Sequence, residues 1–172
     1  MTDADSICWF VARTRRGQEL LIRDKLNGYG VQNFVPVTQT LKVRGGRRIK
    51  AIVPLIHNMV FLRASKSDAC ALANGRGLPV FYVIDRSTNR MLVVPDKQMD
   101  DFIRVVTEEP DSVQLESFNP VPGQKVRIVS GRLQGVEGEV ISASQDTYIV
   151  VSVGQLLSAR VKVQKNCLEP VL

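Results

Sequence analysis

Residues 122–140 constrain the fold of this chain more than any other stretch. Their sequence is Pro-Gly-Gln-Lys-Val-Arg-Ile-Val-Ser-Gly-Arg-Leu-Gln-Gly-Val-Glu-Gly-Glu-Val. Val126 and Ile128 alternate with cationic residues, which is the period of a strand with one buried and one exposed face. Glycines then interrupt the pattern before apolar residues resume. The stretch therefore predicts a strand, a tight turn and a second strand.

This stretch resembles the KOW motif of transcription and ribosome-associated proteins, in which alternating residues surround a fixed glycine, here Gly135. The resemblance implies a small SH3-like β-barrel that often meets RNA or another protein, with a generic β-hairpin as the alternative. All later apolar runs are also short and alternating, at 126–129, 139–142, 147–153, 159–163 and 168–171. Five short strands predict a small closed barrel over residues 121–172, because closure hides the sheet edges.

The first 107 residues predict a different architecture, an α+β sandwich. Runs of aromatic and β-branched residues predict strands, and apolar residues at helical spacing predict helices. The expected strands are 8–12, 33–37, 53–64, 80–84 and 91–94, and the expected helices are 18–29, 65–74 and 95–106. This order indicates one largely antiparallel sheet with the helices packed on it.

Charge divides the chain unevenly. Residues 1–107 hold 17 Lys and Arg against 9 Asp and Glu, and the cations within 38–52 surround two glycines with no acid among them, as in a mobile basic loop or hairpin tip. Residues 108–120 hold four acids and no Lys or Arg, which predicts an acidic flexible linker between domains 1–107 and 121–172. The basic excess favours polyanionic partners or acidic protein surfaces, and plain solubility is the alternative.

Together the two halves resemble the NusG family of transcription elongation factors, in which an N-terminal α+β domain, the NGN domain, is joined by a linker to a KOW barrel. The resemblance covers nearly the whole chain. It rests on Trp9-Phe10-Val11-Ala12-Arg13, Gly17-Gln18-Glu19, Phe34-Val35-Pro36-Val37, Pro54-Leu55-Ile56, Val60-Phe61-Leu62 and the KOW-like stretch.

Two details of the resemblance point beyond the general factor. Residues 91–99 look most like the UpxY group of specialised paralogues, antiterminators that serve polysaccharide-biosynthesis operons. The family usually has Pro-Gly-Tyr before the central strand, where this chain has His57-Asn58-Met59. Because of this departure, the residues that contact the polymerase are not expected to match those of the general factor atom by atom.

No enzyme is expected. The single histidine, His57, has no cysteine or carboxylate at a ligand or triad spacing, and the chain lacks a P-loop and a G-x-G-x-x-G. Cys8, Cys70 and Cys167 are far apart and lack a C-x-x-C spacing, so no disulfide framework, metal or cofactor is indicated. No apolar run of about 18 residues and no signal peptide is visible, which predicts a cytoplasmic protein without membrane contact.

The resemblance implies which residues bind. Family members dock apolar residues on the clamp helices of RNA polymerase, and the aligned set is Ile56, Met59 and Phe61, with Phe10 and Phe81 as neighbours. Because alternation puts Met59 and Phe61 on one face, either both line the docking groove or both are core, and Ile56 is the favoured anchor. Contact with the non-template DNA strand, with nascent RNA as a further candidate partner, is expected from Arg13, Arg15, Arg16, Arg23, Arg44, Arg47 and Arg48, and a solvated basic face is the alternative.

The expected function is therefore a monomeric elongation regulator that suppresses pausing or termination on particular operons. The alternatives are a general NusG factor coupled to Rho, or an RNA-binding or ribosome-associated KOW protein. In general factors the barrel meets Rho or a ribosomal protein through a Phe-Gly pair, and Val153-Gly154 stands at that place here. The β-branched run at residues 148–151 argues against a fold-switching barrel as in the RfaH branch.

Overall fold

The computed structural model describes residues 6–118 and 123–172. By its contacts the chain divides into two compact units, residues 1–95 and 96–172. The predicted division after residue 107 stays a prediction. The structure places the last helix of the expected first domain with the second unit instead, as described below.

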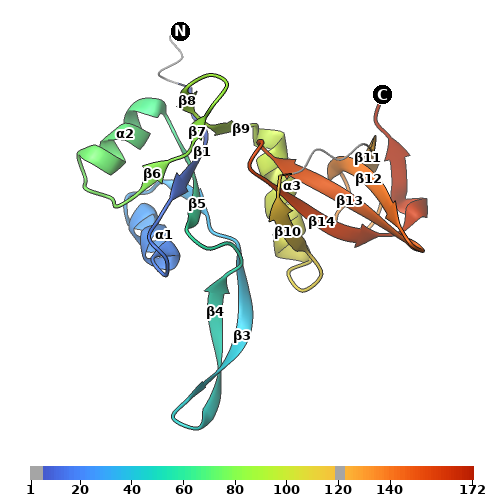
Figure 1. Cartoon of the computed structure of the whole chain (residues 1–172), viewed down its shortest axis with the longest axis horizontal. Helices are drawn as coiled ribbons and strands as arrows, with labels where there is room; N and C mark the ends of the chain where they lie inside the picture. The colour runs from blue at the N-terminus through green and yellow to red at the C-terminus, as the bar shows by residue number, and fades with distance from the viewer. Residues whose placement is uncertain (1–5, 119–122) are drawn as a thin grey trace. The chain divides into compact units, whose positions relative to one another are not determined.

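The first unit is built on an antiparallel sheet with the strand order β2-β5-β1-β6, in which β9 also pairs with β1 (Figure 1). The strands are β1 (Cys8–Arg13), β2 (Gln32–Phe34), β5 (Met59–Ala64), β6 (Phe81–Tyr82) and β9 (Val93–Val94). This arrangement confirms the expected antiparallel sheet of an α+β fold.

Helices α1 (Glu19–Gly28) and α2 (Lys66–Asn74) pack on one face of this sheet. The α1 residues Ile22 and Leu26, four positions apart, are fully buried in the same cluster as Phe10 of β1 and Leu62 of β5. Ser65 begins α2, because its hydroxyl accepts a hydrogen bond from the backbone N–H of Asp68 at 3.0 Å. Both helices were predicted at these places.

The predicted strand 53–64 is wrong as a single element. Its first two residues end β4 (Arg47–Pro54), residues 55–58 turn, and only β5 crosses the sheet. The turn has a backbone cause: Asn58 adopts a φ of 62°, which a continuous strand cannot accommodate. Two separate two-stranded pairs complete the unit, the short pair of β7 (Ile84–Asp85) with β8 (Arg90–Met91) and the longer pair of β4 with β3 (Val37–Arg44).

Of the two expectations for residues 38–52, a basic loop or a hairpin tip, the structure shows the hairpin. β3 and β4 pair over eight residues each, and the turn between them is Gly45-Gly46 with φ of 56° and 75°. Positive φ at both central positions is typical of the tight hairpin turn that matches the twist of the strands. The hairpin extends away from the sheet and helices of its own unit (Figure 1).

The second unit is a six-stranded antiparallel sheet in the order β10-β14-β13-β12-β11-β15. Its strands are β10 (Gln114–Ser117), β11 (Gln124–Ile128), β12 (Glu137–Ala143), β13 (Asp146–Val153), β14 (Leu157–Val163) and β15 (Leu168–Pro170), with a short 3-10 turn, η1 (Lys165–Cys167), before the last. The five predicted strands are present. The predicted linker is not wholly unstructured, because β10 lies inside it and pairs with β14. Over the described residues the sheet runs from β10 to β15 and no closed barrel is found.

Helix α3 (Asp96–Glu108) packs against β13 and β14 of this sheet. Its apolar stripe was correctly identified, since Met99, Phe102 and Val106 are buried. Its partner was predicted wrongly, because an apolar stripe specifies a buried face but not the sheet that covers it. The contacts instead group α3 with the second unit.

Candidate functional surface

The end of β1 brings together residues expected to have two different roles. Arg13 lies opposite Met59 of β5 on one side and opposite Phe81 of β6 on the other. Directly opposed residues of an antiparallel pair share a face, so these three side chains form one row. Met59 is buried at 4% exposure, Arg13 is exposed, and Phe81 is 73% exposed. A solvent-facing aromatic ring thus lies beside a solvent-facing guanidinium group.

The turn at residues 55–58 is fixed beside this row. The buried carboxylate of Glu19, at the start of α1, accepts a hydrogen bond from the backbone N–H of Asn58 at 2.7 Å. The N–H of Thr14 donates to the Asn58 carbonyl at 3.1 Å. The turn carrying Ile56 and the loop after β1 are therefore tied together, with Ile56 partly exposed.

Sequence reasoning missed the role of Glu19, which it named only as part of the family resemblance. The departure at His57-Asn58-Met59 now has a physical explanation. Asn58 stands where the family pattern has glycine, and its φ of 62° is a conformation that glycine adopts freely and asparagine tolerates better than most residues. The substitution therefore keeps the backbone of the turn.

The end of β1 and the loop that follows it, residues 13–16, carry exposed positive charge and are called the arginine loop. Arg13, Arg15 and Arg16 are exposed, and among residues 6–118 and 123–172 none of them forms an ion pair. Arg23 of α1 differs, because its guanidinium contacts the neighbouring Asp24 at 3.0 Å. An exposed pair of this kind contributes little energy and leaves Arg23 able to exchange partners.

The other apolar residues of the expected docking set lie inside the protein. Phe61 is fully buried, and Phe10 is buried in the cluster below the helices, where its ring meets Tyr82 edge-on at 6.1 Å. Burial raises the pKa of Tyr82, whose hydroxyl donates to the Ala69 carbonyl. A docking role for Phe10 and Phe61 stays a prediction, whereas Ile56 and Phe81 are accessible.

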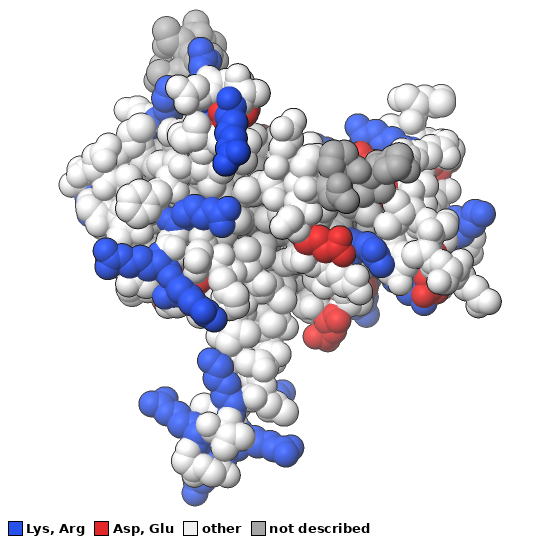
Figure 2. Space-filling model, viewed as in Figure 1, with Lys and Arg blue, Asp and Glu red and all other residues white. Residues whose placement is uncertain are grey.

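The β3–β4 hairpin carries the remaining predicted arginines. Lys42, Arg44, Arg47, Arg48 and Lys50 are all exposed, and Figure 2 shows blue side chains leaving the hairpin in several directions. Sequence reasoning missed that apolar side chains are exposed among them. These are Leu41, Val43, Ile49 and Ile52, with Val43 at 72%. The available signal was their alternation with cations in a stretch without acids.

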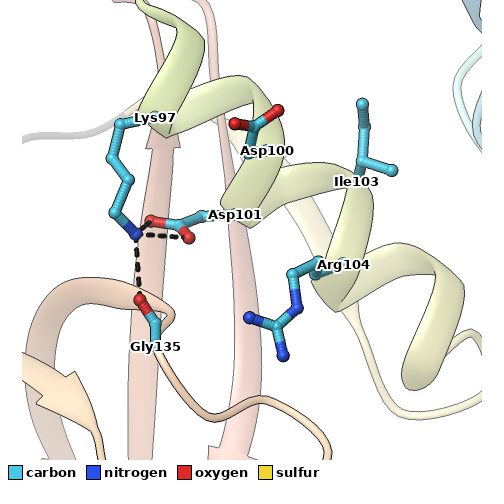
Figure 3. A pocket seen from close by; sticks show the side chains of 6 residues that line it. All are labelled: Lys97, Asp100, Asp101, Ile103, Arg104 and Gly135. Atoms are coloured by element: carbon cyan, nitrogen blue, oxygen red, sulfur yellow. Dashed lines mark hydrogen bonds and ion pairs between the residues drawn. The ribbon is translucent and has the colours of Figure 1, made fainter.

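A hollow in the second unit lies along α3 (Figure 3). It is lined by Lys97, Asp100, Asp101, Ile103, Arg104 and Gly135. The Lys97 ammonium group contacts both carboxylate oxygens of Asp101 at 2.6 Å and donates to the Gly135 carbonyl at 2.9 Å. These groups belong to different elements, α3 and the turn between β11 and β12.

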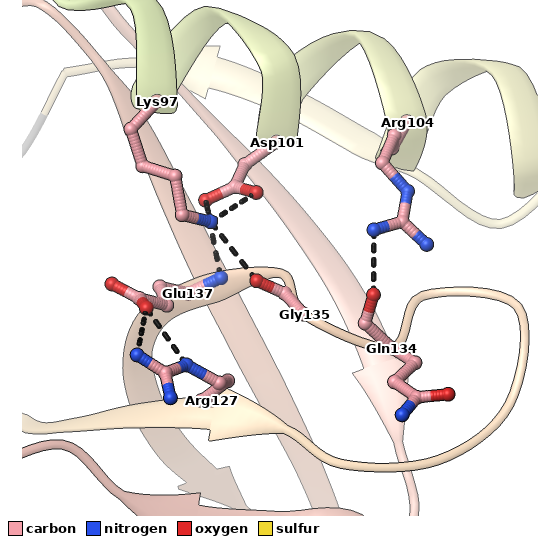
Figure 4. A network of polar contacts seen from close by, with 7 residues as sticks. All are labelled: Lys97, Asp101, Arg104, Arg127, Gln134, Gly135 and Glu137. Carbon is pink, nitrogen blue, oxygen red and sulfur yellow. Dashed lines mark hydrogen bonds and ion pairs between the residues drawn. The ribbon is translucent and has the colours of Figure 1, made fainter.

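The polar groups around this hollow contact one another (Figure 4). The Glu137 N–H donates to Asp101 at 3.2 Å, and the Arg104 guanidinium donates to the carbonyls of Arg132 and Gln134. Arg127 donates two hydrogen bonds to the Glu137 carboxylate, which lowers the pKa of Glu137. This network holds α3 on the turn between β11 and β12. Across the described residues, no cluster of His, Cys, Asp or Glu could hold a metal ion.

A family model described as "Transcription termination factor nusG" matches residues 7–103, more than half of the chain. The chain belongs to the NusG family. The match runs from β1 into α3 and therefore includes both the arginine loop and the hairpin. NusG-family proteins are non-catalytic transcription factors that bind RNA polymerase, which makes this chain a transcription elongation or termination factor.

The NusG match confirms the expected family and ends before the second sheet, so the KOW and UpxY assignments stay predictions. None of the curated proteins matches the chain. In the part of the chain that the structure describes, no helix is both long and apolar enough to span a membrane.

Proposed function

We propose that this NusG-family factor is an operon-specific antiterminator that holds RNA polymerase in a processive state, as the UpxY-type resemblance implies. The observation that best supports the proposal is the row at the end of β1. There the exposed ring of Phe81 lies beside Arg13, next to the turn that carries Ile56. A polymerase helix and a DNA strand could be bound at adjacent points of one rigid surface.

The apolar part of this surface would receive the clamp helices of the polymerase. Ile56 and Phe81 offer accessible apolar area, and each Å² removed from water contributes roughly 25 cal/mol. A helix laid in an apolar groove is a common mode of recognition in which a few such anchors carry most of the affinity. Met59, the buried member of the row, would anchor Arg13 from the β5 side.

The cationic part would hold the displaced non-template strand. Arg13, Arg15 and Arg16 are exposed and have no acidic partner among the described residues. Guanidinium groups bind phosphates and stack on unpaired bases, and both contacts are available in a single strand. Bridging protein and DNA in this way would restrain the clamp and disfavour the paused state.

The second unit would act as a KOW-like recruiting module. Its partner is proposed to be a ribosomal protein or Rho, although Val153-Gly154 in place of the Phe-Gly pair gives no aromatic anchor for that contact. We place the factor in the cytoplasm as a monomer.

A pull-down with core RNA polymerase tests the docking surface. Ile56→Glu introduces a charge at the proposed anchor, and we expect it to weaken polymerase binding about tenfold or more, because the carboxylate must be desolvated against an apolar helix. Leu21→Glu is the matched control, since Leu21 is half exposed on α1 of the same unit. Equal binding by Ile56→Glu and the wild-type protein would remove this interface.

A second arm tests operon specificity. Transcription through a terminator is measured on a template that carries the factor's own operon leader and on one with an unrelated leader. An antiterminator of one operon raises readthrough only on its own leader. Equal readthrough on both templates would instead favour a general elongation factor.

A further inference from the structure

The β3–β4 hairpin has two faces, and the strand register assigns each side chain to one of them. Leu41 pairs with Lys50, and Val43 pairs with Arg48. Directly opposed residues share a face and neighbouring residues alternate. The first face therefore carries Leu41, Val43, Arg48, Lys50 and Ile52.

The second face is formed by the other residues of the same two strands. Lys42 pairs with Ile49, and Arg44 pairs with Arg47. Each face therefore presents at least two cations together with at least one apolar side chain. All residues from 41 to 50 are exposed, and residues 37–54 contain no acid that could neutralise them.

A contact with a flat surface would use only one face of such a ribbon. Cations on both faces are best matched by a partner that places negative charge on both sides at once, as the two phosphate walls of a nucleic-acid groove do. The apolar side chains between the cations suit the floor and sugar walls of a groove, including thymine methyl groups.

We propose that the hairpin inserts into the major groove of duplex DNA. A two-stranded ribbon fits this groove, which is about 12 Å wide in B-form DNA. The major groove of A-form RNA is deep and narrow, which excludes the ribbon. Unpaired strands are held largely by stacking on aromatic rings, and residues 37–54 contain no aromatic residue.

The inference rests on the proposed nucleic-acid role of this factor and narrows it to duplex DNA and to one element. It does not require polymerase binding. The turn that carries Ile56 would bind the polymerase, and the arginine loop would bind the displaced strand. The hairpin would bind the DNA duplex beyond the melted region.

Fluorescence anisotropy with the full-length protein tests the inference. The probes are a labelled DNA duplex of about 20 base pairs, its single strand, and the RNA duplex of the same sequence. Two variants each remove two cations, R48Q with K50Q on the first face and R44Q with R47Q on the second. The matched control, R132Q with K165Q, removes two exposed cations from the second unit.

We expect each face variant to lose at least about fivefold more affinity for the DNA duplex than for either other probe, because Arg13, Arg15 and Arg16 keep their own contact with single strands. Each face variant should weaken duplex binding about tenfold at 0.1 M salt and lower the salt slope by about 1.8, the value for two lost phosphate contacts. The control should change binding less than about twofold. Fluorescence of Trp9, buried in β1, verifies that each variant is folded.

Three results would overturn the inference. If only one face variant weakened binding, the hairpin would lie on a surface and not in a groove. A loss of affinity for the single strand or for the RNA duplex as large as that for the DNA duplex would assign the hairpin to another nucleic acid. If the control variant weakened binding as much as the face variants, the loss of affinity would be due to net charge and not to the hairpin. Ile56→Glu should leave duplex binding unchanged, which separates a failure of the docking surface from a failure of this inference.

Discussion

At the scale of single residues, Asn58 shows how a substitution can preserve a backbone conformation. Its N–H and carbonyl hold Glu19 and Thr14, and both bonds depend on its φ of 62°. The side-chain oxygen of Asn58 is buried and has no hydrogen-bond partner within residues 6–118 and 123–172. The side chain therefore matters mainly because asparagine tolerates this φ. The stability of the turn should then depend on how easily the residue at position 58 adopts the left-handed conformation.

We predict that Asn58→Ala lowers the free energy of unfolding of the first unit by about 1 kcal/mol, whereas Asn58→Gly changes it little, since only alanine meets a steric penalty there. Urea unfolding followed by Trp9 fluorescence measures this, because Trp9 lies in β1 of the same unit. Asn74→Ala, at the exposed end of α2, is the control and should cost less than about 0.5 kcal/mol. Equal midpoints for the two alanine variants would show that the turn is not strained.

At the scale of elements, the attachment of α3 to the turn between β11 and β12 depends on Arg104. Its guanidinium reaches two carbonyl groups, those of Arg132 and Gln134, through separate nitrogens. Lysine carries the same charge but lacks the planar fork that satisfies both acceptors in fixed geometry. The contact should therefore be specific for arginine rather than for positive charge.

We expect Arg104→Met to weaken the closure of this turn by about 1–2 kcal/mol, with Arg104→Lys recovering only part of the loss. Amide hydrogen exchange over α3 and residues 129–136 gives the readout as faster exchange at those sites. Arg132→Met is the matched control, since it removes an exposed side chain but keeps the backbone carbonyl that Arg104 contacts. Unchanged exchange in Arg104→Met would mean that apolar packing alone holds the helix.

The same element marks the limit of what the sequence could predict. Local patterns located α1, α2 and the five strands after residue 123, because periodicity and capping are encoded by neighbouring residues. They did not place α3, because its stripe fits either sheet. They also missed β10, whose acidic surroundings resemble a linker although Leu115 gives it one inward side chain.

The sequence could predict which residues belong to the candidate surface but not how they are arranged in space. The arginines and Ile56 were proposed from the sequence as binding residues, and the structure leaves their side chains at least partly accessible, so their binding role stays a prediction. The row that joins Arg13 to Phe81 depends on strand register, and the tie between Glu19 and Asn58 spans 39 positions in the chain. Such long-range pairs carry no periodic signal in a single sequence.

At the scale of the whole molecule, the excess of positive charge is confined to one part of the chain. Residues 1–95 carry 15 Lys and Arg against 6 Asp and Glu, whereas residues 96–172 carry 8 against 11, so the net charges are +9 and −3. The overall charge of +6 therefore understates the potential around the first unit. The affinity for a polyanion should therefore depend on which unit carries a given cation and not on the total net charge of the chain.

We predict that removing Arg13 and Arg16 as R13Q with R16Q weakens binding to an elongation complex with an exposed non-template strand, and lowers its salt slope by about 1.4, which corresponds to two single-strand phosphate contacts. R132Q with K165Q changes the net charge equally but should leave both values nearly unchanged, because those residues lie in the unit with net negative charge. The measurement is affinity across a salt series on complexes assembled with the polymerase. Equal salt slopes for the two variants would show that binding depends on the total charge of the factor. The proposal that the arginine loop binds the displaced strand would then be wrong.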